Sequence, residues 1–355
     1  MNSISIIVPT YNRATTLWKT LNSVAAVVKP SDSAEIIIVD NGSTDNTVEI
    51  CKGFEDAFPD HRWIYAYEPM PGLLSGRHRG AKEAQGNILA FLDDDVLLAR
   101  GWLEALQEAF ADPGVTLVGG PSRPHYEIQP PVWLNGLWEE SEEGRTCGYL
   151  SLVDQGSSIK PANHRLIWGL NFSIRKTVFQ HCGGFHPDTM PKALQRYQGD
   201  GESGLALKVK EKNLKALYHP DAAVSHMIPV SRLTAESFEQ RGFFQGVCDS
   251  YTQIRRERRV LPALEPCWKD LLRPAKWSLE RKMVLRHPTP EGIRRLMTRS
   301  LVDGMQFHRN KVREDPVLLE WVLRDNYFDY RLPEGWESYA ANEKTSANRP
   351  FRQHS

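Results

Sequence analysis

The sequence has 355 residues, of which 41% are hydrophobic, and its 44 basic side chains are balanced by 44 acidic ones. This length and composition predict a folded protein with a buried core, and the zero net charge argues against a general attraction to nucleic acid. The five cysteines show no CxxC pairing, so we expect no zinc ribbon and a reducing, cytoplasmic setting. We expect no signal peptide and no transmembrane helix, because no apolar stretch approaches about 20 residues.

The first 120 residues alternate short apolar runs, rich in β-branched residues, with segments of helical periodicity. Strands are predicted at 4–8, 35–39, 63–67, 88–92 and 115–119, and helices at 17–28, 48–58, 75–85 and 101–111. Alternation of this kind predicts a largely parallel sheet with helices on both faces and a ligand crevice at the carboxyl ends of the strands.

The alternation stops near Gly120, and residues 121–165 show no periodicity, which predicts an irregular excursion on the acceptor side of the site. Ordered segments return at 166–176, 203–212 and 222–226. From Thr234 the pattern is helical, with further helices expected at 275–285, 290–311 and 315–324. We therefore expect an α/β domain, a helical C-terminal region and a disordered tail, at residues 1–230, 231–340 and 341–355.

Three consecutive carboxylates, Asp93, Asp94 and Asp95, directly follow the apolar strand at 88–92. Adjacent carboxylates repel one another, and a hard divalent cation such as Mg²⁺ or Mn²⁺ relieves this repulsion while bridging to substrate phosphates. The alternative is a solvated acidic turn that caps the next helix. The run therefore predicts a metal site, with the turn left open.

Other polar residues end neighbouring strands and should reach the same crevice. Asp40 closes the strand at 35–39, and Pro9, Thr10 and Tyr11 follow the first strand. A turn or helix cap is the alternative interpretation of Asp40.

Five motifs in order resemble glycosyltransferase family 2 over residues 4–226. They read IVPTYNR at 7–13, IIVDNGSTDNT at 37–47, GLLSGRHRGAKEAQGNILAFLDDD at 72–95, GLNFSIRKTVFQHCGGF at 169–185, and GDGESGLALKVKE at 199–211 followed by His226.

The resemblance implies a GT-A fold, which is Rossmann-like with a mostly parallel central sheet, together with an inverting mechanism and a nucleotide-sugar donor. It implies that Asp95 binds the metal, Mn²⁺ or Mg²⁺, and that His226 completes the metal site, although a lone His is more often structural. His78 departs from the family, which usually has Asn there. The donor-binding residues implied by the resemblance are Pro9, Thr10, Tyr11, Asp40, Arg77, Asp93 and Asp94.

An inverting transfer needs a carboxylate that takes the proton of the acceptor hydroxyl. The family places this base just before a helix, a position that Glu202 matches when one counts back from Leu205. The segment reads GDGESGL rather than the usual GED-type motif, so Asp200 is kept as the second candidate. The alternative for both is helix capping.

Two residues of the segment 166–176, Trp168 and Asn171, match the family's acceptor-side strand, with core packing as the alternative for the tryptophan. Clusters of Arg and Lys in the C-terminal helices suggest peripheral contact with the inner face of the membrane, or simply solvated helix faces. The clusters comprise Arg255, Arg256, Arg258, Arg259, Arg281, Lys282, Arg286, Arg294, Arg295 and Arg299.

We therefore expect metal-assisted transfer of a sugar from a UDP-, GDP- or dTDP-sugar to an acceptor hydroxyl, with no nucleic-acid partner. Two other classes are retained, a nucleotidyltransferase and a non-catalytic module that binds nucleotide sugars. The three classes differ in product. A glycosyltransferase releases a nucleoside diphosphate, a nucleotidyltransferase releases pyrophosphate, and a binding module releases neither.

Overall fold

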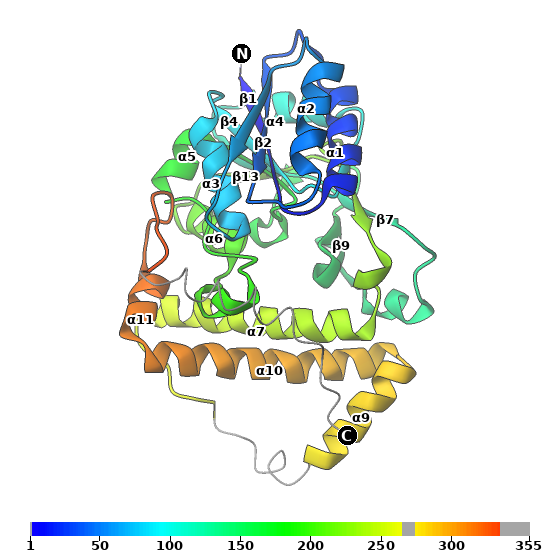
Figure 1. Ribbon diagram of the computed structural model, residues 1–355, viewed down its shortest axis with the longest axis vertical. Coiled ribbons are helices and arrows are strands. Elements are labelled where there is room, and N and C mark those ends of the chain that lie inside the picture. Colours follow the sequence, from blue (N-terminus) through cyan, green and yellow to red (C-terminus); the bar gives the residue numbers. More distant parts are fainter. Residues whose placement is uncertain (1, 265–273, 334–355) are drawn as a thin grey trace.

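The computed structural model describes residues 2–264 and 274–333 (Figure 1). The tail predicted at 341–355 and the end of the predicted helical region lie outside the described residues. Among the described helices, none combines the length and apolarity that a membrane-spanning segment needs.

The central sheet is built around three strands that follow the predicted apolar runs. β1 (Ile4–Thr10) pairs in parallel with β2 (Ala34–Asp40) and with β4 (Ile88–Leu92), and β2 pairs in parallel with β3 (Trp63–Tyr67). The carboxyl ends of β1, β2 and β4 therefore meet at one edge of the sheet, as the alternating pattern predicts.

The other half of this sheet is mixed. β12 (Asn171–Arg175) runs antiparallel to both β4 and β6 (Val115–Gly119), β13 (Lys215–Tyr218) runs parallel to β6, and β11 (Lys160–Pro161) lies antiparallel at the edge. The antiparallel β12 therefore lies beside β4, the strand that ends in the acidic run.

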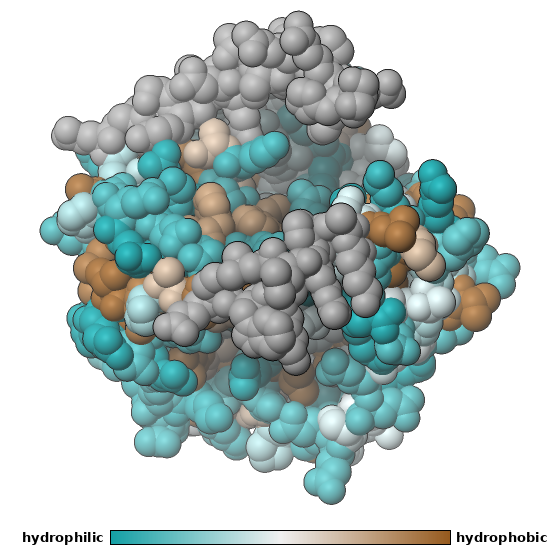
Figure 2. All heavy atoms as spheres, turned by 90° about the horizontal axis from the view of Figure 1, so that it is seen from below, coloured by the Kyte–Doolittle hydropathy of each residue, from teal (hydrophilic) through white to brown (hydrophobic). Residues whose placement is uncertain are grey.

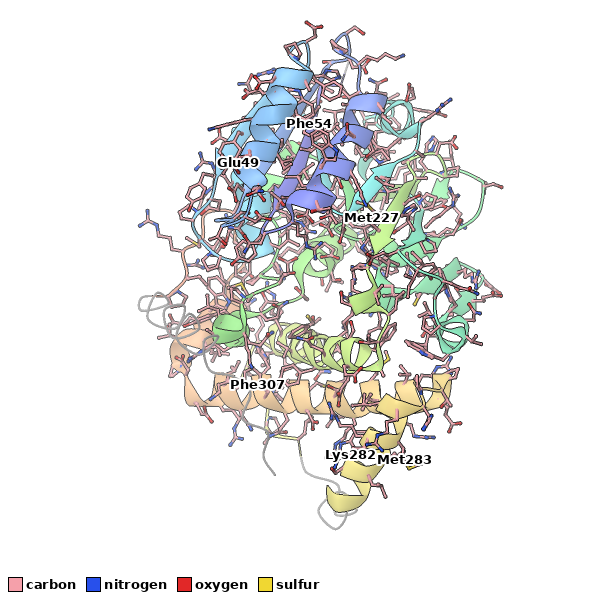
Figure 3. All side chains as sticks on the ribbon, turned by 45° about the vertical axis from the view of Figure 1, so that its right-hand side comes forward. Glu49, Phe54, Met227, Lys282, Met283 and Phe307 are labelled. Carbon is pink, nitrogen blue, oxygen red and sulfur yellow. The ribbon has the colours of Figure 1, made fainter. Side chains whose placement is uncertain are left out.

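Helices cover both faces of the sheet because alternate residues of β1 point to opposite sides. On one face, Ile6 and Val8 pack with α1 (Ala14–Val27), α2 (Thr47–Ala57) and α4 (Trp102–Ala109). Phe54 of α2 lies against Trp18 of α1, with ring centroids 4.6 Å apart (Figure 3).

On the opposite face, Ile7 packs with α3 (Leu73–Glu83), α5 (Lys176–His181) and α6 (Gly201–Glu211). The same hydrophobic cluster contains Tyr251 and Trp321 from the C-terminal helices. The helices that follow residue 230 therefore share a core with the sheet.

Residues 121–165 are more regular than predicted. They contribute β7 (Ser122–Tyr126), β8 (Glu139–Ser141), β9 (Gly144–Cys147) and β10 (Leu152–Asp154) to a second sheet, which β5 (Val96–Leu98) and β14 (Val224–Ile228) complete. These strands are too short, and several too exposed, for an alternating pattern to be visible in the sequence. β14 also begins and ends two residues later than predicted, so His226 lies in its middle.

Two long helices lie side by side on the lower side of the molecule in Figure 1, and both run in the same direction. α7 (Ala235–Glu257) and α10 (Pro290–Glu314) are linked by a hydrogen bond between Ser250 and His308. The shorter α9 (Pro274–Arg286) and α11 (Pro316–Leu323) flank them. At Gly246, a Cβ atom would lie 1.9 Å from the carbonyl oxygen of Leu301. The two backbones are therefore in direct contact.

Gly246→Ala should lower the free energy of unfolding by about 1–3 kcal/mol, because the added methyl group forces α7 and α10 apart. The matched control is Gly53→Ala in α2, where a Cβ would meet nothing within 4 Å. The control should stabilise by up to about 1 kcal/mol through helix propensity. Urea unfolding of the three proteins measures both effects, and equal stability of the two variants would contradict the close contact.

Candidate functional site

A cavity of about 2560 Å³ lies between the carboxyl edge of the central sheet and α7 (Figure 3). One wall is formed by the loops that follow β1 and β4, and another by the start of α6 and the face of α7. The predicted residues that line it are Pro9, Thr10, Tyr11, Arg77, Asp93, Asp94, Asp95, Asp200, Glu202 and His226.

The acidic run after β4 is neutralised by basic side chains. Nη1 of Arg13 lies 2.6 Å from Asp95 and 3.2 Å from Asp94. Thr10 also donates a hydrogen bond of 2.7 Å to Asp94, while burial raises the pKa of Asp94 to about 7. Sequence reasoning missed Arg13, whose only signal was its place in the motif IVPTYNR.

Asp95 and His226 face each other at the predicted metal position. His226 donates from Nδ1 to the carbonyl oxygen of Leu150 at 2.9 Å, so its Nε2 carries a lone pair. This Nε2 lies 3.4 Å from Oδ1 of Asp95, a buried oxygen with no hydrogen-bond partner within the described ranges. The arrangement fits a shared cation, because adjacent ligands with bonds of about 2.1 Å lie about 3 Å apart.

A metal here would need ligands from outside the protein as well. Among the residues that the structure describes, no group of three or more His, Cys, Asp or Glu side chains could hold a metal. Donor phosphates and water commonly complete such sites. Nη1 of Arg232 donates to Nε2 of His226 at 2.9 Å, so this guanidinium would have to move before a cation could bind.

Arg77 is fully buried and joins three carboxylates. Its Nη2 lies 3.0 Å from Asp93, and its Nη1 lies 3.0 Å from Asp188 and 3.7 Å from Glu202. The guanidinium also lies over the ring of Phe185, with 5.0 Å to the centroid. One side chain therefore connects the acidic run to the predicted base. Asp188 was not predicted, because a lone Asp in a loop gives no signal in the sequence.

The two candidate bases have different surroundings. Glu202 lies in the first turn of α6 with 24% of its side chain exposed, whereas only 7% of the Asp200 side chain is exposed. Asp200 accepts hydrogen bonds of 2.7 Å from both Thr252 and Nδ1 of His186. The carboxylate of Asp200 is thus fully occupied in holding α6 against α7, while that of Glu202 faces the cavity.

The unusual glycine in GDGESG has a local explanation. A Cβ atom at Gly204 would lie 2.0 Å from Nδ1 of His186 and 2.4 Å from Oδ1 of Asp200. Only glycine leaves room for the hydrogen bond between these two side chains.

Residues 5–181, about half of the chain, match the family model described as glycosyl transferase family 2. Glycosyltransferase AglE of Haloferax volcanii is 38% identical over 117 residues, which are 33% of this chain and 38% of that protein. Validoxylamine A glucosyltransferase of Streptomyces hygroscopicus subsp. jinggangensis is 30% identical over 208 residues, covering 52% of this chain and 47% of that protein. The chain belongs to glycosyltransferase family 2.

The match spans less than half the length of either relative. A solved mannosyltransferase from Pyrobaculum calidifontis, in complex with GDP-Man and Mn²⁺, superposes with a TM-score of 0.54. It is 18% identical and covers 98% of this chain and 88% of the other. At this identity the likeness shows the fold alone, which is the GT-A fold.

Asp40 lies outside the cavity lining, contrary to the expectation that it projects into the crevice. It is 1% exposed, and its two oxygens accept hydrogen bonds from the backbone N–H of Ser43 at 2.7 Å and the hydroxyl of Tyr65 at 3.0 Å. The carboxylate thus fixes the loop after β2. Asn41, Gly42 and Tyr67 line the cavity in this region.

The acceptor-side residues also lie outside the cavity lining. The amide of Asn171 accepts a hydrogen bond from the indole of Trp102 and donates one to the carbonyl of Ala222. Trp168 is half-buried, packs against the sheet core and donates to the carbonyl of Arg165. Asn171 thus fixes the start of β12, and the packing of Trp168 agrees with the core-packing alternative.

His78, where the family usually has Asn, accepts a hydrogen bond from the backbone N–H of Phe185 at 2.9 Å. Burial lowers its pKa to about 3, so the ring is neutral. It packs edge-on against Phe179 and Phe328. His78 is therefore part of the core behind Arg77.

Many of the predicted basic clusters are engaged within the protein. Arg281 pairs with Glu239 at 2.6 Å, Arg295 with Glu291 at 2.5 Å, and Arg255 donates to the carbonyl of Val322 at 2.5 Å. Lys282 remains exposed on α9 (Figure 3). Seen from below, the described surface is mostly hydrophilic with scattered hydrophobic residues (Figure 2). Much of the expected positive charge is therefore compensated by neighbouring residues.

Asp188→Asn should make the free energy of unfolding less sensitive to pH. Burial raises the pKa of Asp188 to about 7 although Arg77 opposes the shift, and Glu202 and Asp93 add to it. Because this folded-state pKa lies above the unfolded value of about 4, the wild type loses stability as the pH rises from about 4 to 7, and the variant lacks that loss. Urea unfolding at about pH 4.5 and pH 7.5 tests this.

The control for this experiment is Asp60→Asn, because Asp60 is exposed. The free energy of unfolding of this variant should equal that of the wild type at both pH values. If the stability of Asp188→Asn relative to the wild type fell with rising pH, the direction of the shift would be refuted.

His226→Gln should weaken binding of Mn²⁺ in the presence of a nucleoside diphosphate by about tenfold or more, because the amide is a poorer ligand than imidazole. Electron paramagnetic resonance of free Mn²⁺ gives the affinity without reference to turnover. The control is His125→Gln, an exposed histidine on the neighbouring strand β7, which should bind Mn²⁺ like the wild type. Equal affinities of all three proteins would remove His226 from the metal site.

Proposed function

We propose that the chain is an inverting glycosyltransferase that moves a sugar from a nucleoside diphosphate to an acceptor hydroxyl. The observation that carries this proposal is the contact of one buried guanidinium, Arg77, with both the acidic run and Glu202. Asp93 lies 3.0 Å from Nη2, and Glu202 lies 3.7 Å from Nη1. A single in-line displacement requires a donor site and a base close to one reacting carbon, and Arg77 holds the two candidate groups near each other.

The size of the cavity supports a reaction of two substrates. Pockets for one drug-sized ligand measure about 300–1,000 Å³, and this cavity holds about 2560 Å³. The donor would lie along the loops after β1 and β4, and the acceptor between Glu202 and α7.

In the proposed displacement, the acceptor hydroxyl attacks C1 of the donor sugar while its proton passes to Glu202. The bond from C1 to the diphosphate oxygen breaks on the opposite face of the sugar, so that the anomeric configuration inverts. Arg13 and Arg232 lie beside Asp95, where their charges would stabilise the departing diphosphate.

A divalent cation fits Asp95 and His226, and when bound it would neutralise charge on the leaving diphosphate. The donor set of one carboxylate oxygen and one imidazole nitrogen favours Mn²⁺ over Mg²⁺, because Mg²⁺ takes oxygen ligands. The solved mannosyltransferase also holds Mn²⁺, with GDP-Man. We therefore propose Mn²⁺ as the working metal and leave open UDP-, GDP- and dTDP-sugars as donors.

A cytoplasmic location is the setting that we propose. Cys51, Cys147, Cys182 and Cys248 are free thiols, and three of them are buried. Cys267 lies outside the described residues. Thiols that stay unpaired are typical of a reducing compartment.

Glu202→Gln should reduce the rate of transfer by about 10²–10⁴ with little change in nucleotide binding, because the amide cannot accept the proton. The assay is release of nucleoside diphosphate from a panel of nucleotide sugars with Mn²⁺, with nucleotide affinity measured by calorimetry. Release of pyrophosphate instead would indicate a nucleotidyltransferase, and release of neither a binding module.

Asp200→Asn is the comparison for this prediction. It should lower the melting temperature more than Glu202→Gln does, because it disrupts hydrogen bonds to His186 and Thr252. If it instead abolishes transfer while Glu202→Gln remains active, the base is Asp200.

A further inference from the structure

The face of α7 that borders the cavity carries one arginine that differs from the other cations of the site. Residues Ser237, Arg241, Phe244, Cys248 and Thr252 line the cavity from this face, at the spacing of successive helical turns. Within the described ranges, Arg241 makes no hydrogen bond and no ion pair. By contrast, Arg255 on the same helix donates to backbone carbonyls.

The surroundings of Arg241 penalise an uncompensated charge. Burial and the neighbouring guanidinium of Arg232 together lower its pKa to about 10. The side chain is only partly exposed at the cavity, and a cation that loses part of its water without gaining a counter-ion carries a free-energy cost. A group that brings a negative charge to Arg241 would relieve this cost.

Contacts in the structure separate the surroundings of the two arginines. Arg232 lies 4.0 Å from Asp95 and donates to His226, so it belongs to the predicted metal position. The cavity face of α7 that carries Arg241 instead contacts the segment before Glu202, where Thr252 of this face donates a hydrogen bond of 2.7 Å to Asp200. Arg241 therefore stands on the side of the base, where the acceptor hydroxyl must lie.

We propose that Arg241 binds an anionic group, a phosphate or a carboxylate, carried by the acceptor of the reaction. This inference rests on the proposed function and adds the chemical class of the second substrate. A guanidinium presents paired N–H donors that match two oxygens of either group. An acceptor held there would place a nearby hydroxyl toward Glu202, so that the anion fixes which hydroxyl reacts.

Direct binding of small anions tests the site without catalysis. Methyl phosphate and acetate are titrated by calorimetry against the full chain saturated with Mn²⁺ and a nucleoside diphosphate, so that the donor phosphate positions are occupied. At least one anion should bind the wild type about tenfold or more tightly than Arg241→Gln. The anion that binds more tightly indicates whether the acceptor carries a phosphate or a carboxylate.

The matched control is Arg313→Gln, an exposed arginine of α10 that does not line the cavity. This variant should bind both anions like the wild type. If Arg241→Gln and the wild type bind both anions equally, the proposal is overturned.

Kinetics with matched acceptors provide the second test. The panel is methyl glucoside, glucose 6-phosphate and glucuronic acid, assayed by release of nucleoside diphosphate. For the wild type, kcat/KM should be highest for a charged member, and Arg241→Gln should reduce its preference over the neutral member by about tenfold or more. An equal preference in the wild type and the variant would refute the proposal.

Two outcomes separate this inference from the proposed function. If the wild type releases no nucleoside diphosphate from any donor, the proposed function fails, whereas the anion titration still decides whether Arg241 binds an anion. If Arg241→Gln weakens the nucleoside diphosphate as much as the small anions, Arg241 serves the donor and the acceptor assignment is overturned.

Discussion

The pairing of the buried guanidinium of Arg77 with Asp93, Asp188 and Glu202 is the constraint on which the rest of the site depends. Three ionised carboxylates around one cation would leave an excess of negative charge, and burial reduces this excess by raising the pKa of Asp188 to about 7. Residues from α3, from the strand end after β4 and from the start of α6 are held within reach of one another by a single side chain. The distance between the acidic run and Glu202 is thereby set in the folded protein.

A second group of cations compensates the charge of the acidic run, which is largely buried. Arg13 contacts Asp94 and Asp95, and Arg232 contacts His226. The side chains that these arginines contact, Asp95 and His226, are the ones that a divalent cation would use as ligands. If a metal bound here with a donor, as we propose, one set of positive charges would replace another, and the displaced guanidinium groups would remain close to the phosphates. The site can change its ligands without ever exposing uncompensated carboxylates.

The central part of the fold could be predicted from the sequence, because continuous apolar runs bounded by polar turns define buried strands. The predicted strands at 63–67, 88–92 and 115–119 have the observed ends. The second sheet could not be predicted, since its strands are short and partly exposed. Its cohesion comes from pairing between segments far apart in the chain, as in the contact of β7 with β14.

The site shows the same division. The acidic run, Arg77, Glu202 and His226 lie together around the cavity. The acidic run was predicted from its position after an apolar strand, whereas the other three residues were predicted only from the resemblance to a family. Arg13, Asp188 and Arg241 are single charges with no repeat or motif chemistry of their own, so only their partners in space, or the lack of one, reveal them. Asp40 was misplaced because a residue at a strand end can also turn inward, and the hydroxyl of Tyr65 on the adjacent strand holds it there.

The direct contact of α7 and α10 at Gly246 has a consequence for how the acceptor side can change. With backbone against backbone, the two helices have no layer of side chains between them at this point that could repack and let α7 shift. The wall that α7 contributes to the cavity therefore has a fixed position, and its shape is adjustable only through the side chains that α7 presents to the cavity. Under the proposed function, adaptation to a larger, smaller or differently charged acceptor would proceed by substitution along the cavity-lining face of α7, while the width of the cavity stays constant.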